Sequence, residues 1–397
     1  MSAKAIAKST RIQSIDLLRG VVIIIMALDH VRDYFHADAF LYNPLNLEKT
    51  NAAVFLTRWI THMCAPVFIF LAGTSAFLVG ARKSKKDLSS FLLTRGLWLI
   101  VLELTVMNFG WFFNVQFSLI VLQVIWALGF GMIVLAGAIH LPFNAILTAG
   151  IVIVAGHNLL DGIQVEGNGI DAMLWSILHG FQFFDFGDRF FFAGYAILPW
   201  TGIMLLGYCF GKLYLPAVNP DVRKKTLLRL GVGAIALFLV LRMFNIYGNP
   251  TPWTSQGNAV FTFLSFINVN KYPASLQFVL VMLGPAFLFL AFAEKLKGNV
   301  WDKITALGRV PLFFYIVHVY VIHIIALIAA LATGYKLQDM VFITWITDSP
   351  NLRGYGFSLG VMYLFWIGIV LALFPLCLWY DRYKTKHSKE KKWLSYL

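Results

Sequence analysis

The segment RIQSIDLLRGVVIIIMALDHVRDYFH occupies residues 11–36 and joins a long apolar run to a group of ionisable side chains. The run of Val, Ile, Met and Leu suits a membrane-spanning helix, which needs about 20 mostly apolar residues. It ends in Asp29, His30, Arg32, Asp33 and His36. Charged or titratable groups at membrane depth are costly unless they pair or line a wet cavity. The segment therefore predicts a first spanning helix that carries part of a functional site.

Composition extends this interpretation to the whole chain of 397 residues. It is 59% hydrophobic and only 13% charged, which excludes an ordinary soluble protein. Charges, not a small-residue cleavage site, follow the first apolar run, so we expect it to remain as a helix. We predict an all-α polytopic membrane protein, with residues 1–397 forming one domain and about ten transmembrane helices in one bundle. The ten segments are 15–35, 53–80, 91–113, 117–139, 143–158, 194–214, 226–246, 274–295, 305–333 and 357–380.

The loop charges predict the orientation. The net charge is +13, but the basic residues gather in alternate connections, as the positive-inside rule requires, so they do not indicate nucleic-acid binding. We place both termini, including a basic tail from about residue 381, in the cytoplasm. The predicted inner residues are Lys4, Lys8, Arg11, Arg82, Lys83, Lys85, Lys86, Arg223, Lys224, Lys225, Lys295, Lys297 and Lys303; the outer loops carry Glu48, Asp161, Glu166, Asp171, Asp185, Asp188, Asp339 and Asp348. The short inner loops suggest a multi-pass protein of a bacterial inner membrane.

Other patterns restrict the chemistry. Cys64, Cys209 and Cys377 fall in separate predicted helices, so we expect buried thiols and no disulfide. No serine-nucleophile motif, phosphate-cradling loop or Cys/His metal spacing is visible, and we predict no metal site. We expect residues 158–192, rich in Gly and Phe, to form an interfacial element, either an aromatic belt or a cap over a site.

Three histidines are predicted at a similar membrane depth. Arg19 and His30 are eleven residues apart, which at about 100° per residue brings them within roughly 20° of one helix face and about 16 Å apart along it. His62 and His318 reach a similar depth on two other helices, and Tyr315 shares a face with His318. The three imidazoles can face one cavity. Interhelical hydrogen bonding without any catalytic role remains an equally good reading.

Carboxylates accompany this histidine layer. Asp29, beside His30, can hold the tautomer of the imidazole and raise its basicity, as a general base requires. Arg32 can pair with His36 or with a carboxylate near the helix end. Glu103 lies in mid-span and needs a partner that the sequence does not name, whereas Arg242 near a helix end suits packing or snorkelling.

Several motifs resemble one known family. The opening RIQSIDLLRG with the later LDH resembles the heparan-α-glucosaminide N-acetyltransferase catalytic-domain family and its bacterial relatives, and Arg19 and His30 are also similar to a signature of inner-membrane sugar O-acyltransferases. The similarity continues in THMCAPVFIFLAGTSAF (61–77), LPWTGIMLLGYCFGKL (198–213), NKYPASLQFVLVMLGP (270–285) and LGRVPLFFYIVHVYVIH (307–323). The resemblance implies transfer of an acetyl group from cytosolic acetyl-CoA to a sugar or glycan on the far side. It nominates His36 as well as His30 for the essential histidine.

Two functional hypotheses follow. In the first, the protein is an acetyl-CoA-dependent transmembrane acyltransferase, with His30 as base or acyl carrier and Asp29 orienting it. Arg19 then lies toward the donor, with Arg309, Arg82 and Lys83 as phosphate ligands; His36, His62 and His318 lie near the acceptor. A continuous tunnel from the basic loops to the histidines would distinguish it. The second is a transporter or flippase of a lipid-linked or anionic solute, which favours internal repeats that we do not find. Membrane lipids are partners in both, and a homodimer is compatible with either; a scaffold without activity ranks last.

Overall fold

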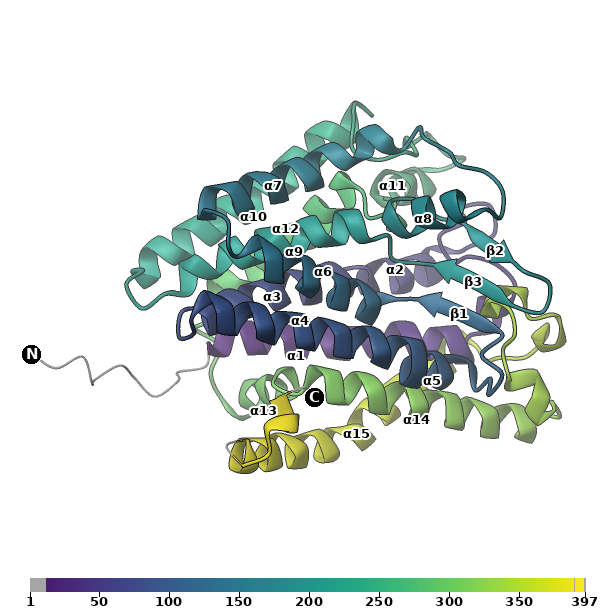
Figure 1. The fold of residues 1–397 in the computed structure, drawn as a ribbon. Helices are drawn as coiled ribbons and strands as arrows, with labels where there is room; N and C mark the ends of the chain where they lie inside the picture. Colours follow the sequence, from purple (N-terminus) through teal and green to yellow (C-terminus); the bar gives the residue numbers. More distant parts are fainter. Residues whose placement is uncertain (1–11, 389, 396–397) are drawn as a thin grey trace, which may run out of the picture.

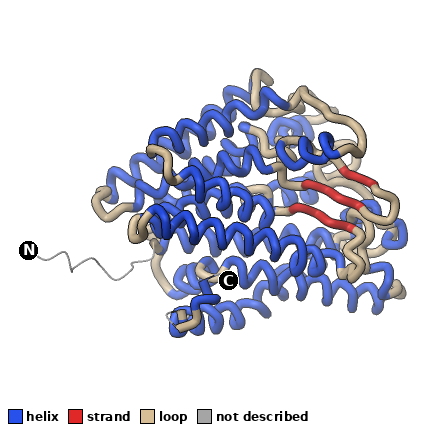
Figure 2. Tube along the Cα trace, viewed as in Figure 1, coloured by secondary structure: helices blue, strands red, loops and turns tan. Residues whose placement is uncertain are grey.

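The computed structural model describes residues 12–388 and 390–395, so that Lys4, Lys8 and Arg11 of the orientation prediction lie outside it. The chain forms a bundle of helices with a small sheet at one end (Figures 1 and 2). The ten predicted segments correspond to α1 (Gln13–Phe35), α2 (Ala52–Thr61) with α3 (Cys64–Gly80), α4 (Lys85–Leu102) with α5 (Asn108–Phe112), α6 (Val124–Ala138), α7 (Phe143–Gly156), α9 (Ile197–Phe210), α10 (Pro220–Met243), α12 (Leu276–Ala293), α14 (Pro311–Ala332) and α15 (Leu359–His387). Three further helices are α8 (Ile170–Leu178), α11 (Ala259–Ile267) and α13 (Asn299–Gly308).

Seven segments of the described chain are long and apolar enough to cross a membrane. They are α2 with α3, α4 with α5, α7 with the 3-10 turn η3 (His157–Leu160), α10, α12, α14 and α15. Ten spans therefore remain a prediction, since α6 and α9 have only 15 and 14 residues and α1 is not among the seven. In Figure 1, α1 begins and α15 ends at the same, left-hand end of the bundle. This arrangement agrees with the predicted common side for both termini without establishing which side it is.

The sheet corrects the expectation of an all-α chain. Its strands are β1 (Leu119–Leu122), β2 (Phe183–Asp185) and β3 (Phe190–Ala193), in the order β1-β3-β2. β1 pairs in parallel with β3, with Leu119 opposite Phe190, and β2 pairs antiparallel with β3. The predicted fourth helix at 117–139 thus begins as a strand, because branched and aromatic side chains suit a pleated surface as well as an apolar helix. The sheet lies at the end of the bundle opposite the start of α1 (Figure 2).

Two predicted spans contain interruptions. The second breaks at His62 and Met63, between α2 and α3. The third passes through a π-helical turn, η2 (Glu103–Met107), and Asn108 donates a hydrogen bond of 2.7 Å to the carbonyl oxygen of Glu103. The Glu103 carboxylate accepts a 3.0 Å hydrogen bond from the backbone N–H of Trp126 in the first turn of α6. The partner of this buried acid is therefore a helix N-terminus, which favours negative charge.

α1 is the central helix, in contact with α2, α3, α12, α13, α14 and α15. Its crossing with α13 is especially close. A Cβ atom on Gly20 would lie 2.0 Å from the carbonyl oxygen of Ile304, and one on Gly308 would lie 1.7 Å from that of Asp16. Only glycine fits at these positions, and the contact brings the residues that follow Gly308 beside the first turns of α1.

Candidate functional site

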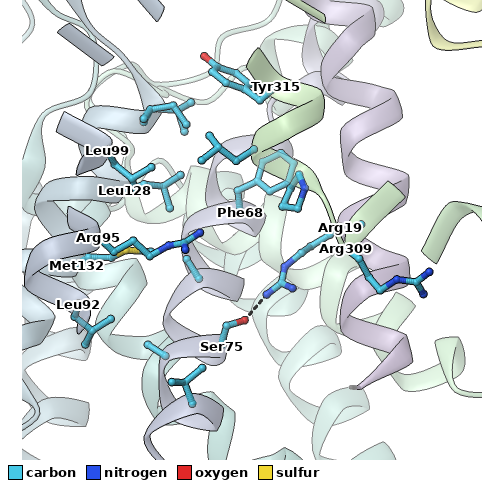
Figure 3. A pocket seen from close by; sticks show the side chains of 18 of the residues that line it. Arg19, Phe68, Ser75, Leu92, Arg95, Leu99, Leu128, Met132, Arg309 and Tyr315 are labelled. Carbon is cyan, nitrogen blue, oxygen red and sulfur yellow. Dashed lines mark hydrogen bonds between the residues drawn. The ribbon is translucent and has the colours of Figure 1, made fainter. Parts of the chain in front are cut away.

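A cavity of about 300 Å³ lies among α1, α3, α4, α6 and α14. Most of its wall is apolar, with Leu92, Leu99 and Leu128 among the lining side chains. Four basic residues also line it: Arg19, Arg95, Arg309 and Lys384. Figure 3 shows Arg19 and Arg95 reaching into it from opposite sides. The cavity therefore combines an apolar channel with a strongly basic end.

Arg19 is held in place by several partners, of which three follow. It forms an ion pair of 3.0 Å with Asp16, donates a 3.0 Å hydrogen bond to the carbonyl oxygen of Leu71, and donates another to the hydroxyl of Ser75 (Figure 3). Arg309 is placed differently, because its guanidinium makes a bidentate pair with Asp381 of α15, with Nε 2.8 Å from Oδ1. In Figure 3 it points away from Arg19 and Arg95. Arg309 thus lines the cavity, but its charge is engaged by α15.

A second, smaller cavity of about 40 Å³ continues toward the histidines. Its polar lining consists of Asp29, His30, Thr61, Cys64, Tyr195, Lys271 and Tyr315. The two cavities share the side chains of Met26, Phe68, Val124 and Tyr315 in their walls. The basic end of the larger cavity and the imidazole of His30 therefore belong to two adjoining spaces, separated by these shared side chains.

His30 and His318 form a hydrogen-bonded pair. Nδ1 of His30 lies 2.7 Å from Nε2 of His318, and Nδ1 of His318 lies 2.9 Å from the carbonyl oxygen of Phe314. A carbonyl only accepts, so Nδ1 of His318 carries hydrogen and its Nε2, in a neutral ring, accepts from Nδ1–H of His30. This order leaves the lone pair of neutral His30 on Nε2. Within the described chain, Nε2 has no hydrogen-bond partner, and the His30 ring packs in T-shaped arrangements with the rings of Trp111 and Tyr315.

Among the described residues, no hydrogen bond joins Asp29 to His30, although the predicted orienting role of Asp29 calls for one. The Asp29 carboxylate accepts from Arg58 of α2 and, at 3.2 Å, from Arg32, which also pairs with Asp33 at 2.5 Å. These buried guanidinium groups satisfy the acid, so the neighbour of His30 in sequence is not its hydrogen-bond partner. His318, 288 residues away in the sequence, orients the ring instead.

Two other predicted histidines lie outside both cavities. His62 is buried, and neither of its ring nitrogens has a hydrogen-bond partner; its ring packs 5.7 Å from that of Phe278. His36 ends α1, where the backbone pairs with the segment before α15, and Phe357 N–H donates to the Phe35 carbonyl at 2.7 Å. Burial lowers the pKa of His36 below its ordinary value. Of the predicted histidines, the structure thus brings together His30 and His318.

Sequence analysis missed Lys271, Arg58 and Arg95 as members of this site. Lys271 is buried, lines the smaller cavity, and lies over the rings of Tyr195 and Tyr272 at 5.7 and 5.1 Å. A signal for it exists, because Lys271 is the only charged residue between Arg242 and Glu294. The predicted packing role of Arg242 is confirmed, since its guanidinium donates to the backbone carbonyls of Phe266, Thr251, Ser265 and Asn268.

A helical bundle with several membrane-length apolar helices and a largely apolar cavity that four basic residues line defines a polytopic membrane protein with a cavity among its helices. The model of the family described as heparan-alpha-glucosaminide N-acetyltransferase, catalytic, matches residues 11–247. This match covers more than half of the 397 residues, and the chain belongs to that family of membrane acetyltransferases. A comparison with curated proteins found no match. Lys271, Tyr315 and His318 lie beyond the matched residues, so the site combines matched and unmatched parts of the chain.

Proposed function

We propose that the protein transfers an acyl group, acetyl in the first instance, from acetyl-CoA to a hydroxyl or amine of a sugar or glycan on the opposite side of the membrane. His30 is the general base, His318 its positioning residue, and the basic cavity the donor site. The observation that carries this proposal is the hydrogen-bond order Phe314–His318–His30, which leaves a lone pair on Nε2 of an imidazole that lines a cavity adjoining the basic one.

The donor end suits a nucleotide thioester. Guanidinium groups bind phosphates through paired N–H donors, and Arg19 and Arg95 enter the larger cavity among apolar side chains such as Leu99 and Leu128. Ser75 and Asp16 hold Arg19 in one orientation, which reduces the ordering that binding requires. The pantetheine arm then lies along the apolar channel toward Tyr315, with the thioester near the shared wall of the two cavities.

The acceptor is deprotonated as it attacks. Its oxygen or nitrogen bonds to the thioester carbonyl carbon while its proton moves to Nε2 of His30, and the carbon–sulfur bond then breaks. The coenzyme A sulfur leaves and takes up that proton, so His30 is neutral again. Lys271 and Tyr195, which line the same small cavity, can stabilise negative charge on the carbonyl oxygen. Exclusion of bulk water from the bundle limits hydrolysis of the thioester.

The acceptor approaches from the end that carries the sheet. The aromatic side chains predicted to cap a site differ in exposure at this end. Phe184 is fully buried, whereas Phe181 is 53% exposed and stacks on Tyr272, next to Lys271 in sequence. Such exposed rings suit the faces of sugars. With the basic loops in the cytoplasm, this end faces the far side of a bacterial inner membrane.

The test compares donor binding and turnover in purified protein in nanodiscs, with radiolabelled acetyl-CoA and a panel of amino sugars and lipid-linked glycans. His30→Ala should bind acetyl-CoA and lose transfer, His36→Ala should keep both, and the exposed His140→Ala serves as the matched control. Loss of transfer in His36→Ala alone would assign the base to His36 and overturn the mechanism. A folded wild type that binds no acetyl-CoA would overturn the function and favour the transporter or flippase.

A further inference from the structure

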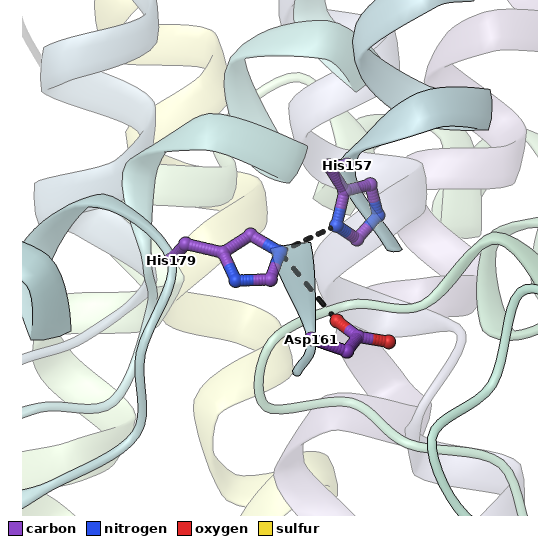
Figure 4. A group of neighbouring side chains, drawn as sticks. All are labelled: His157, Asp161 and His179. Carbon is purple, nitrogen blue, oxygen red and sulfur yellow. Dashed lines mark hydrogen bonds and ion pairs between the residues drawn. The ribbon is translucent and has the colours of Figure 1, made fainter. Parts of the chain in front are cut away.

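A second histidine pair, His157 and His179, lies outside the two cavities, near the point where α7 ends and η3 (His157–Leu160) begins. Among the residues that the structure describes, His157, Asp161 and His179 are the one group of His, Cys, Asp and Glu side chains whose ligand atoms converge, all within 4.8 Å of one another. Figure 4 shows His157 and Asp161 facing one nitrogen of the His179 ring. Nδ1 of His157 is 3.0 Å, and Oδ1 of Asp161 is 3.6 Å, from Nε2 of His179.

These separations match those around a small divalent ion. Zn²⁺ binds imidazole nitrogen and carboxylate oxygen at about 2.0–2.2 Å, so two ligands at a tetrahedral angle lie roughly 3.3–3.5 Å apart. The two measured separations lie on either side of this value. The third separation, between His157 and Asp161, is within 4.8 Å, so rotations of these side chains can bring the three atoms around one ion, with a fourth position for water.

The three converging atoms have more lone pairs than hydrogens to share among them. When both rings are neutral, the nitrogens of His157 and His179 share one hydrogen, and the Asp161 oxygen can only compete for it as another acceptor. A divalent cation accepts all three lone pairs at once. Both histidines are 3% exposed, so water has little access to the imidazoles, whereas it reaches the partly exposed carboxylate of Asp161.

The carboxylate is also oriented from behind, as metal-binding carboxylates usually are. Asn158 donates a 2.8 Å hydrogen bond from Nδ2 to Oδ2 of Asp161, the oxygen that does not face His179. The side-chain oxygen of Asn158 accepts a 2.9 Å hydrogen bond from the backbone N–H of Leu276, at the start of α12. The ligand set is thereby linked to three elements: η3, the end of α8 and the start of α12.

We propose that His157, Asp161 and His179 bind one divalent transition-metal ion, of the Zn²⁺ class, as a structural clamp. Two imidazoles and one carboxylate favour zinc over Ca²⁺ or Mg²⁺, which prefer oxygen ligands. The ion joins the end of α7 to the end of α8, directly before the β2–β3 hairpin. β3 then leads to Tyr195, so the clamp holds the segment that forms one wall of the smaller cavity.

The experiment measures metal binding, not acyl transfer, and is therefore independent of the proposed function. Full-length protein without a histidine tag is stripped with chelator in nanodiscs and titrated with ZnCl₂, and bound metal is counted by mass spectrometry. We expect one ion per chain, and at least tenfold weaker binding in His179→Ala and Asp161→Asn. His140→Ala and Asp171→Asn, at exposed positions outside the group, should bind like wild type.

Cobalt(II) provides a second measurement on the unmutated chain, which remains valid if the variants fold poorly. Co²⁺ in this site should give visible d–d absorption bands that one equivalent of Zn²⁺ removes. Unmutated protein that takes up no metal, or that takes it up without these bands, would overturn the proposal. Zinc bound equally well by wild type and by folded His179→Ala would overturn it as well.

Discussion

The two histidine pairs of this protein have similar contacts and different third partners. His30 and His318 approach to 2.7 Å, and His157 and His179 approach to 3.0 Å. In the first pair the outer partner is the Phe314 carbonyl, which forces one order of protons and leaves a lone pair on His30. In the second pair the third group is the Asp161 carboxylate, whose oxygen adds another lone pair next to the two ring nitrogens. The comparison teaches that the third group decides whether two imidazoles form a directed base or a ligand set.

The largest expected effect is a difference in kcat between variants of the two histidine pairs. His30→Gln should lower kcat by about 10²–10⁴-fold, since it removes the base that takes the acceptor proton, with donor affinity unchanged. His157→Gln should leave kcat within about threefold of wild type if Zn²⁺ there is structural. Steady-state kinetics on both variants checks this. Equal losses in the two would mean that the pairs do not differ in function.

The acids beside the two pairs should differ in their effect on stability. Asp29→Asn leaves the buried Arg58 without its ion-pair partner, whereas Arg32 keeps Asp33, and should lower the free energy of unfolding by about 3–5 kcal/mol. Asp161 is partly exposed, so Asp161→Asn in chelated protein should cost about 1 kcal/mol or less. Denaturation in mild detergent measures both changes. A stable Asp29→Asn variant that has lost only kcat would support the orienting role of Asp29.

His318 tests the direction of the central hydrogen bonds. His318→Phe removes the acceptor for Nδ1–H of His30 and should reduce kcat by about 10–100-fold, with little change in KM, because the base loses its tautomer and orientation. His318→Gln, whose amide oxygen can accept that hydrogen, should recover part of the loss. Identical kinetics in the two variants would indicate that His318 acts by packing alone.

The smallest expected effect concerns Arg19, a basic residue in the cavity that adjoins the His30 site. Arg19→Gln should raise the donor KM about tenfold, or about 1.4 kcal/mol, and change kcat little, because Arg19 lies at the basic end of the cavity. Arg223→Gln, which removes a basic partner of Glu294 away from the cavity, is the matched control. Equal donor KM values in the two variants would show that the cavity does not hold the donor phosphates.

Much of the helical framework could be predicted from the sequence, because an apolar run of membrane length has few other stable states. Even the short fifth segment forms a helix, α7, as expected. The errors arose where apolar residues suit two structures. Leu119–Leu122 has the composition of a helix but forms a strand, because Phe190–Ala193 supplies a hydrogen-bonding partner 71 residues further along.

Some residues of the candidate site could also be predicted from the sequence, and others could not. Periodicity along one helix placed Arg19 and His30 on a common face, and both line the adjoining cavities. The sequence analysis did not identify His157, Asp161 and His179 as a group, because they converge only when the end of α7 and the end of α8 pack together. Lys271 and Arg95 were not predicted as site residues, because their positions in the cavity walls depend on which helices pack together.

The sequence alone established a membrane-embedded helical chain, its family and the helix that carries His30, since these follow from local composition and motif. The tertiary structure alone decided the partners of each polar group. Asp29 forms ion pairs with Arg58 and Arg32, and His30 forms a hydrogen bond with His318. The physical reason is that hydrogen bonds and ion pairs act over a few ångströms, so the close crossings of distant helices determine which charges and lone pairs meet.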